Sequence, residues 1–287
     1  MKELFVSSVA SGERSVERAV TSLVAHGFYS VELTGGHDFV DGLGDTLVLL
    51  QHELHAHFMV HNYFPPQRAD FVLNLASLDP TVADNSMRLC REAIGMAQLL
   101  GSNAYSIHAG FYLDPKVSDL GKGFTGRIVA SRDAAMSVFC ERLTRLSADY
   151  PDMTFYLENN CYTQKAHSRY GDVPHSMLCT FNDFMELKEN IPFKLLLDVA
   201  HLYVTSKSLG LSFEREYAQF VDHAEYIHIS DNDGRSDLNH GLRIGSDICN
   251  AVSRSILHSK IITLEIYSGL AEVKNSYDLL RTTIQGN

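Results

Sequence analysis

Residues 194–230 read KLLLDVAHLYVTSKSLGLSFEREYAQFVDHAEYIHIS and contain the alternation of elements from which the architecture follows. Two short runs, 194–198 and 226–230, are rich in aliphatic residues and are typical of buried strands. Between them, residues 213–221 carry apolar side chains at helical spacing. A strand, a helix and a second strand in this order predict two parallel strands joined by a helical crossover.

The same alternation continues along the whole chain. Eight candidate strands, each followed by a helix-like stretch, occupy residues 4–8, 29–33, 58–63, 104–108, 154–159, 194–198, 226–230 and 261–267. Eight such units predict an α/β fold in which residues 1–287 form a single (β/α)8 TIM barrel. The main alternative is a doubly wound open sheet. Residues 8–14, SVASGER, lack the glycine-rich phosphate-binding turn that usually follows the first strand of such a sheet.

Apolar stripes and capping residues locate several of the helices. Residues 16–24 share an apolar face that ends before Gly27, and Asp79 and Pro80 supply a cap and a first-turn proline for the helix after the third strand. Later helices are expected at residues 182–189, 213–221, 247–257 and 271–284. We interpret the long segments 111–130 and 161–178 as loops over one mouth of the barrel.

The composition is that of a globular protein and excludes several functional classes. The net charge is −11 and 45% of the residues are hydrophobic, which excludes a disordered chain. No apolar run approaches the roughly 18 residues of a membrane span, and residues 1–5 lack a leader pattern, so we expect a cytoplasmic protein. The acidic balance disfavours non-specific binding of nucleic acid. The five cysteines are scattered, which excludes a disulfide framework or a thiolate metal site.

Side chains that can bind a metal stand at the C-terminal ends of six predicted strands. They are His61, His108, Glu158, Asp198, His228 and Glu265. In a TIM barrel these ends meet at the mouth that carries the active site. A single strand histidine is more often a hydrogen-bonded core residue, and a single strand-end carboxylate often caps the next helix. Six ionisable strand ends together instead predict one shared site.

The carboxylates of Glu158, Asp198 and Glu265 would repel one another inside a barrel unless a cation offset their charge. A divalent ion resolves that conflict, and carboxylates mixed with imidazole suit Zn²⁺ or Mn²⁺. Further donors follow in the sequence: His201 on the turn that leaves the sixth strand, then Asp237 and His240. We expect one bound ion. Because the sequence offers more ligand-type residues than one ion can use, two or three ions stay open as alternatives.

The remaining histidines are expected at the surface, at helix ends or in loops. They are His26, His37, His52, His55, His57, His167, His175, His223 and His258. The acidic run at residues 231–234 lacks the bidentate glutamate of a calcium loop, so we do not assign calcium binding to it.

The order of ligand-type residues resembles the xylose-isomerase-like TIM-barrel superfamily. The matching pattern is His61, His108, Glu158, Asp198-x-x-His201, His228, Asp237 with His240, and Glu265. This superfamily contains sugar isomerases and epimerases together with the endonuclease IV type of apurinic-site nuclease. Residues 71–77, FVLNLAS, also resemble the segment after the third strand of the nuclease branch.

The resemblance implies two different ligand sets. In the isomerases one divalent ion is held by the residues that match Glu158, Asp198, His228 and Glu265. The nuclease branch adds two zinc ions: the residues matching His61, His108 and Glu158 hold one, and those matching His201, Asp237 and His240 hold the other. All members of the larger set are present here.

Three features of the sequence depart from the nuclease branch. The spacing from Asp237 to His240 is one residue longer than the nuclease's Asp-x-His, and Val199 stands where the nuclease has Thr or Ser. The nuclease also needs a cationic loop after the second strand. Residues 34–45 carry three aspartates there, which would repel a phosphodiester backbone, although Phe39 could act as a wedge between bases.

These observations favour a sugar isomerase or epimerase. The resemblance implies proton transfer through a metal-stabilised enediolate, with Glu158 and Glu265 on nearly opposite strands acting as base and acid. His201 is expected to assist catalysis by orienting substrate hydroxyls. Further substrate contacts are expected from His61, His108 and Glu32, and from Arg235 or Arg243 if the substrate carries a phosphate or carboxylate.

Two alternatives stay open at this point. The first is an endonuclease IV-like, zinc-dependent apurinic-site phosphodiesterase, in which a metal-activated water attacks the DNA backbone. The second is a barrel without catalytic activity that binds a carbohydrate or a protein partner. The expected partner is a small carbohydrate, with no membrane attachment, and the sequence leaves open whether the chain forms a homo-oligomer.

Overall fold

A closed barrel of eight parallel strands forms the centre of the molecule in the computed structural model, which describes residues 3–119, 124–128 and 131–285. The strands are β1 (Glu3–Ser7), β2 (Ser30–Leu33), β3 (His57–His61), β4 (Ala104–His108), β5 (Thr154–Glu158), β6 (Lys194–Asp198), β7 (Ala224–Ile229) and β8 (Ile261–Leu264). Each strand pairs with the next along the chain, and β8 closes the ring by pairing with β1. The predicted single (β/α)8 TIM barrel is confirmed.

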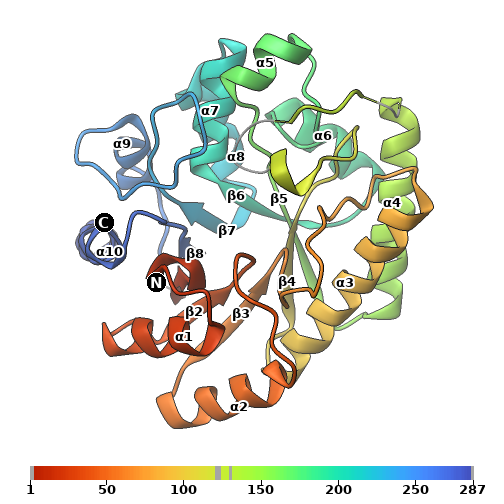
Figure 1. The fold of residues 1–287 in the computed structure, drawn as a ribbon. Coiled ribbons are helices and arrows are strands. Elements are labelled where there is room, and N and C mark those ends of the chain that lie inside the picture. The colour runs from red at the N-terminus through yellow and green to blue at the C-terminus, as the bar shows by residue number, and fades with distance from the viewer. Residues whose placement is uncertain (1–2, 120–123, 129–130, 286–287) are drawn as a thin grey trace.

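Helices surround the strands and connect each strand to the next (Figure 1). The α-helices are α1 (Val16–Ala25), α2 (Leu43–Leu54), α3 (Pro80–Leu99), α4 (Arg132–Asp149), α5 (Gln164–Tyr170), α6 (Phe181–Asn190), α7 (Val199–Leu209), α8 (Phe213–Val221), α9 (Asp247–Ser253) and α10 (Leu270–Gln285). Two short 3-10 helices are η1 (Ser8–Ser11) and η2 (Val117–Asp119). Among the described residues, no helix is both long enough and apolar enough to cross a membrane.

The sequence located β4, β6 and α8 at their observed bounds, and the other strands and helices differ at their ends. Helix α7 was missed because it begins directly after β6, so His201 lies in its first turn and not on a turn that leaves the strand. The loop expected at 161–178 contains α5, and the loop expected at 111–130 contains η2. Residues 120–123 and 129–130 of that second loop lie outside the described residues.

Local signals explain why several helices begin where they do. The side chain of Asp79 accepts hydrogen bonds from the backbone nitrogens of Thr81 and Val82, directly before Pro80 opens α3. Thr180 and Asp183 form a reciprocal capping box at the start of α6. These caps satisfy backbone donors that the first helical turn leaves without partners.

Successive side chains of each strand point alternately outward and inward, and this produces two separate apolar layers. Alternate residues such as Leu195 and Leu197 point outward and join the large core between the strands and the helices. The intervening residues point inward, where a second buried cluster fills the lower part of the barrel: Phe5, Met59, Ala104, Tyr156, Leu196 and Tyr226. This inner cluster, here called the barrel floor, lies near the middle of most strands and leaves the mouth at their C-terminal ends for polar groups.

Two histidines expected at the surface are buried. His37 forms hydrogen bonds through both ring nitrogens, with its Nε2 2.8 Å from Ser8 Oγ and its Nδ1 3.1 Å from the Glu13 carbonyl oxygen. His175 packs edge-on against the rings of Phe124 and Tyr162. Both lie in loop segments, and periodicity in the sequence gives no signal for burial of a loop residue.

Candidate metal centre

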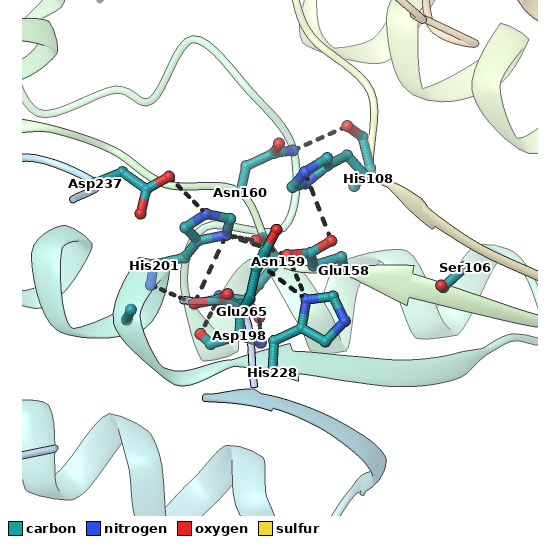
Figure 2. A network of polar contacts seen from close by, with 12 residues as sticks. Ser106, His108, Glu158, Asn159, Asn160, Asp198, His201, His228, Asp237 and Glu265 are labelled. Carbon is teal, nitrogen blue, oxygen red and sulfur yellow. Dashed lines mark hydrogen bonds and ion pairs between the residues drawn. The ribbon is translucent and has the colours of Figure 1, made fainter. Parts of the chain in front are cut away.

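Four side chains converge where β5, β6, β7 and β8 end (Figure 2). Glu158, Asp198, His228 and Glu265 each offer a ligand atom, and these atoms all lie within 4.8 Å of one another. All four residues are buried. The register explains the convergence, because Asp198 pairs with His228 across β6 and β7, and Glu265 directly follows β8. The structure therefore brings together the four ligands that the resemblance implied for a single divalent ion.

Nδ1 of His228 lies close to both glutamates of this group. It is 3.2 Å from Oε2 of Glu265 and 3.5 Å from Oε1 of Glu158. Oε1 of Glu158 is also 3.4 Å from Nδ1 of His201, whose ring lies beside the group. Donor atoms from several strands thus surround one small volume, which is the geometry that a metal ion needs.

A second group shares Glu158 with the first. Oε2 of Glu158 is 3.2 Å from Nε2 of His61 and 3.5 Å from Nε2 of His108, and the three residues again offer ligand atoms within 4.8 Å of one another. The other ring nitrogen of His61 contacts the Ser106 hydroxyl at 2.9 Å. The residues expected at an additional zinc site of the nuclease type are therefore close together.

The third expected set is only partly assembled. Nε2 of His201 lies 3.2 Å from Oδ2 of Asp237. His240 is exposed, and its backbone pairs with Asp231 in an isolated bridge. Within the described residues, these three side chains form no group whose ligand atoms all approach within 4.8 Å.

Asn159 is a site residue to which the sequence argument gave no role. Its side-chain oxygen accepts a hydrogen bond from the backbone nitrogen of Asp198 at 2.7 Å, and its side-chain nitrogen donates to the Asp198 carbonyl oxygen at 3.0 Å. Its own carbonyl oxygen lies 2.9 Å from Nδ1 of His201. Asn159 therefore positions both residues, and its place directly after Glu158 was the signal available in the sequence.

Asp198 has two structural tasks. It ends β6 among the ligand atoms, and as the N-cap of α7 its Oδ1 accepts a hydrogen bond of 2.6 Å from the backbone nitrogen of His201. This residue is therefore a helix cap, as a single strand-end carboxylate often is. It is also one of the candidate metal ligands.

Glu32 was expected to contact substrate, and the structure places it among other buried groups. Its side chain is fully buried inside the barrel, where it contacts Tyr226 and His228. Glu32 is not among the described residues that line the cavity above the ligand group, and the expected substrate contact stays a prediction. The sequence showed that Glu32 ends a strand but carried no information about which interior layer it would occupy.

The two arginines proposed as anion contacts also lie elsewhere. The side chain of Arg235 is exposed, and the guanidinium of Arg243 pairs with Asp231, with Nε 3.3 Å from Oδ2. Neither arginine is among the described residues that line the cavity above the ligand group. The structure therefore gives no support for a phosphate or carboxylate contact from either side chain.

Burial and the charges of neighbouring groups shift the pKa values of the carboxylates. Burial, together with the negative charges of Glu158 and Glu265, outweighs the attraction of His201 and raises the pKa of Asp198 to about 8. Burial alone would also raise the pKa of Glu265, but its contact with His228 dominates and lowers that pKa to about 2. The centre is therefore strongly negative when all its carboxylates are ionised.

The imidazoles respond to the same charges. Burial opposes protonation of His228, but Glu32 and Glu158 outweigh it and hold its pKa well above the usual range. Asp198 and Asp237 overcome burial in the same way and raise the pKa of His201. At His108 burial dominates and lowers the pKa to about 4, so this ring is neutral at pH 7 and can offer a lone pair.

The residues present fit a divalent cation. Both carboxylate oxygens of Glu158, Nδ1 of His228 and Oδ1 of Asp237 are buried and have no hydrogen-bond partner among the described residues. Buried polar atoms without partners are costly, and a cation would satisfy several of them at once. Carboxylate and imidazole donors without thiolates suit Zn²⁺, Mn²⁺ or a related first-row ion.

A cavity of about 360 Å³ opens above the ligand group. Its wall includes His61, His108, His201, Asp237, Glu265 and Tyr267. The hydroxyl of Tyr267 donates a hydrogen bond of 2.5 Å to Oε1 of Glu265, a contact that the sequence argument did not identify. The volume lies within the roughly 300–1,000 Å³ that is usual for small-molecule sites.

Metal affinity should increase with pH between about pH 6 and pH 8. Because the pKa of Asp198 is raised to about 8, a proton competes with the cation for this carboxylate below that pH. Displacement of this proton alone should lower the apparent dissociation constant about ninefold from pH 6 to pH 7 and about fivefold from pH 7 to pH 8. Competition with a chromophoric chelator measures this constant. An affinity that does not change over this range would contradict the assignment of Asp198 as a ligand.

Comparison with known proteins identifies the family. Residues 20–283 match the family described as xylose isomerase-like TIM barrel, and the chain belongs to that family. No curated protein matches the sequence. The predicted resemblance is confirmed at the level of the family, and the roles assigned to individual residues stay predictions.

Similar solved structures include both branches of the superfamily. A D-tagatose 3-epimerase-like protein has a TM-score of 0.73 at 16% identity, covering 99% of this chain and 97% of its own. A D-psicose 3-epimerase from Clostridium cellulolyticum, solved with D-tagatose, has a TM-score of 0.67 at 11% identity over 98% and 99%. Endonuclease IV from Thermus thermophilus has a TM-score of 0.62 at 14% identity over 99% and 100%. At these identities the likeness establishes the shared fold.

Proposed function

We propose that this protein is a divalent-metal-dependent epimerase or isomerase that acts on a small keto sugar or sugar derivative. The observation that carries the proposal is the group of four buried ligand residues, Glu158, Asp198, His228 and Glu265, beside a cavity of small-molecule size whose wall includes Glu265. Sugar epimerases among the similar structures support the same interpretation.

We assign the proton transfer to two glutamates of this group. Glu158 comes from β5 and Glu265 from the end of β8, so their carboxylates approach the centre from different sides of the barrel. One would remove a proton from the sugar carbon and the other would return a proton to the opposite face. A bound divalent ion would hold the substrate's carbonyl and hydroxyl oxygens and offset the negative charge that develops on them.

The imidazoles around the cavity supply orientation. His61 and His108 line the same cavity as Glu265, and the low pKa of His108 leaves it free to accept a hydrogen bond from a substrate hydroxyl at pH 7. His201 is held by the Asn159 carbonyl through Nδ1, which directs Nε2 toward Asp237 and the cavity. Fixed donors and acceptors of this kind favour a polyhydroxylated ligand.

Tyr267→Phe should lower kcat about tenfold at saturating metal concentration, and it should also weaken metal binding because Glu265 belongs to the ligand group. The Tyr267 hydroxyl donates to Glu265, and a hydrogen bond to a carboxylate stabilises its charged form. Its loss raises the pKa of Glu265 and loosens the orientation of this base. Steady-state kinetics measures the effect, and Tyr203→Phe is the matched control because Tyr203 donates to Asp247 at the surface. Equal kcat values in both variants would exclude a role for Tyr267.

One observation favours the nuclease as a second candidate. The group His61, His108 and Glu158 is assembled as an additional zinc site would require. In addition, two of the three aspartates that were expected to repel a phosphodiester backbone are paired with arginines. Asp38 pairs with Arg14, and Asp41 pairs with Arg68. Against this candidate, His240 lies exposed and apart from His201 and Asp237.

A parallel assay distinguishes these functions. The protein is loaded with Mn²⁺ or Zn²⁺ and incubated with a panel of ketoses and keto acids, and separately with a DNA duplex that contains an abasic site. Epimerisation or isomerisation of a panel member, with no cleavage of the duplex, is the expected result. Cleavage of the duplex alone would establish the nuclease, and no turnover of either substrate class by metal-loaded protein would favour a binding protein.

A further inference from the structure

A buried glutamate beneath the ligand group has no role in the proton transfer proposed above. Glu32 lies on β2 and is fully buried, as are its partners Tyr226 and His228 on β7. Oε2 of Glu32 lies 3.1 Å from Nε2 of His228. The glutamate thus reaches across the barrel interior to the Nε2 side of His228, where ligand atoms of Glu32, His61 and His228 lie within 4.8 Å of one another.

A chain of hydroxyl groups holds Glu32 in place. The Tyr226 hydroxyl donates a hydrogen bond to Oε2 of Glu32 and lies 2.6 Å from Oγ1 of Thr263. Because the phenol proton is directed to the carboxylate, the Thr263 hydroxyl donates to Tyr226. This chain connects β8, β7 and β2, and the ring of Tyr226 belongs to the barrel floor. The carboxylate is therefore fixed by packed, buried groups.

The two nitrogens of His228 consequently have different surroundings. Nε2 faces the Glu32 carboxylate, which can only accept a hydrogen bond when ionised. Nδ1 faces Glu158 and Glu265 and has no hydrogen-bond partner among the described residues. A carboxylate behind one imidazole nitrogen keeps a proton there, so the proton that a metal displaces is the one on the other nitrogen, Nδ1.

We infer that Glu32, held by Tyr226 and Thr263, is a positioning residue that sets the tautomer and ring orientation of His228, so that Nδ1 is presented to a divalent cation. The inference rests on the metal centre of the proposed function and adds a residue outside its ligand set. It also gives Glu32 a role that differs from the substrate contact expected from the sequence.

The test measures binding of Co²⁺ to the full chain after removal of metal, by competition titration and by the visible absorption of the bound ion. Glu32→Leu removes the acceptor, and Glu32→Gln keeps an acceptor but removes the charge. Tyr226→Phe removes the hydroxyl that fixes Glu32. The matched control is Tyr156→Phe, because Tyr156 belongs to the same barrel floor and packs edge-on against Tyr226.

We expect Glu32→Leu to weaken Co²⁺ binding about 10- to 100-fold and to change the visible absorption of the bound ion. Glu32→Gln and Tyr226→Phe should show smaller losses in the same direction, and Tyr156→Phe should bind as the wild type does. Urea unfolding of the metal-free proteins separates these losses from a general loss of stability. If Glu32→Leu does not fold, Glu32→Gln and Tyr226→Phe decide the question against the same control.

Two results would overturn the inference in different ways. Wild-type affinity and absorption in the Glu32 and Tyr226 variants would show that Glu32 only fills the barrel interior, and the proposed function would still stand. Failure of the wild-type protein to bind Co²⁺ would overturn the proposed metal-dependent function, and the inference with it.

Discussion

Glu265→Gln and Glu158→Gln are each expected to lower kcat for epimerisation by about 1,000-fold or more. General acid–base catalysis contributes up to about 10⁴-fold, and an amide cannot accept the substrate proton. Both carboxylates also belong to the ligand group, so the bound metal must be measured in each variant. Glu225→Gln is the matched control, because Glu225 lies near the opposite end of β7 and pairs with Lys194 at the surface.

Hydrogen exchange in D2O gives a sharper form of this prediction. If the two carboxylates serve opposite faces of the sugar carbon, each variant should lose epimerisation but still exchange the proton of one epimer with solvent. The two variants should retain exchange with different epimers, which NMR can follow. Retained turnover in both variants, with normal metal content, would refute the assignment of these glutamates as base and acid.

Removal of divalent metal is expected to abolish turnover, and addition of Mn²⁺ or Zn²⁺ should restore it. Without a cation, the carboxylates of Glu158, Asp198 and Glu265 repel one another, and the substrate carbonyl has no strong electrophile beside it. The measurements are activity after dialysis against a chelator, metal content per chain and far-UV circular dichroism. The dichroism should show that the barrel stays folded.

The metal count also separates the candidates. One exchangeable ion per chain agrees with the epimerase, and three zinc ions per chain would favour the nuclease. Full activity in protein shown to contain no divalent metal would contradict the proposed chemistry. A protein that binds no metal after reconstitution would favour the binding-protein alternative.

The number and order of strands could be predicted because each strand is a short apolar run in a regular alternation with helices. The convergence of six ionisable strand ends followed from the same reasoning, since the C-terminal ends of parallel strands must meet at one mouth. The choice of four of them as the ligand group came from the resemblance to the family. Helix α7 could not be predicted in this way, because Asp198 ends the strand and caps the helix without any intervening residue that marks a turn.

The sequence did not show how deep inside the barrel each inward-pointing side chain lies. A period of two indicates that Glu32 and His228 both point inward, but the relative height of β2 and β7 depends on the closure of the whole ring. For that reason Glu32 was expected beside the substrate, although it lies beneath His228. The sequence could not place His240 either, because it lies in a loop that is paired with Asp231 through an isolated bridge.

The barrel floor makes the centre a blind-ended chamber. Phe5, Met59, Tyr156, Leu196 and Tyr226 block passage along the barrel axis, so ions, water and any ligand must enter and leave through the same opening. A bound sugar cannot flip to present its other face inside a chamber that is closed at one end. If its configuration is inverted in this chamber, the reacting groups must already stand on both flanks before it arrives.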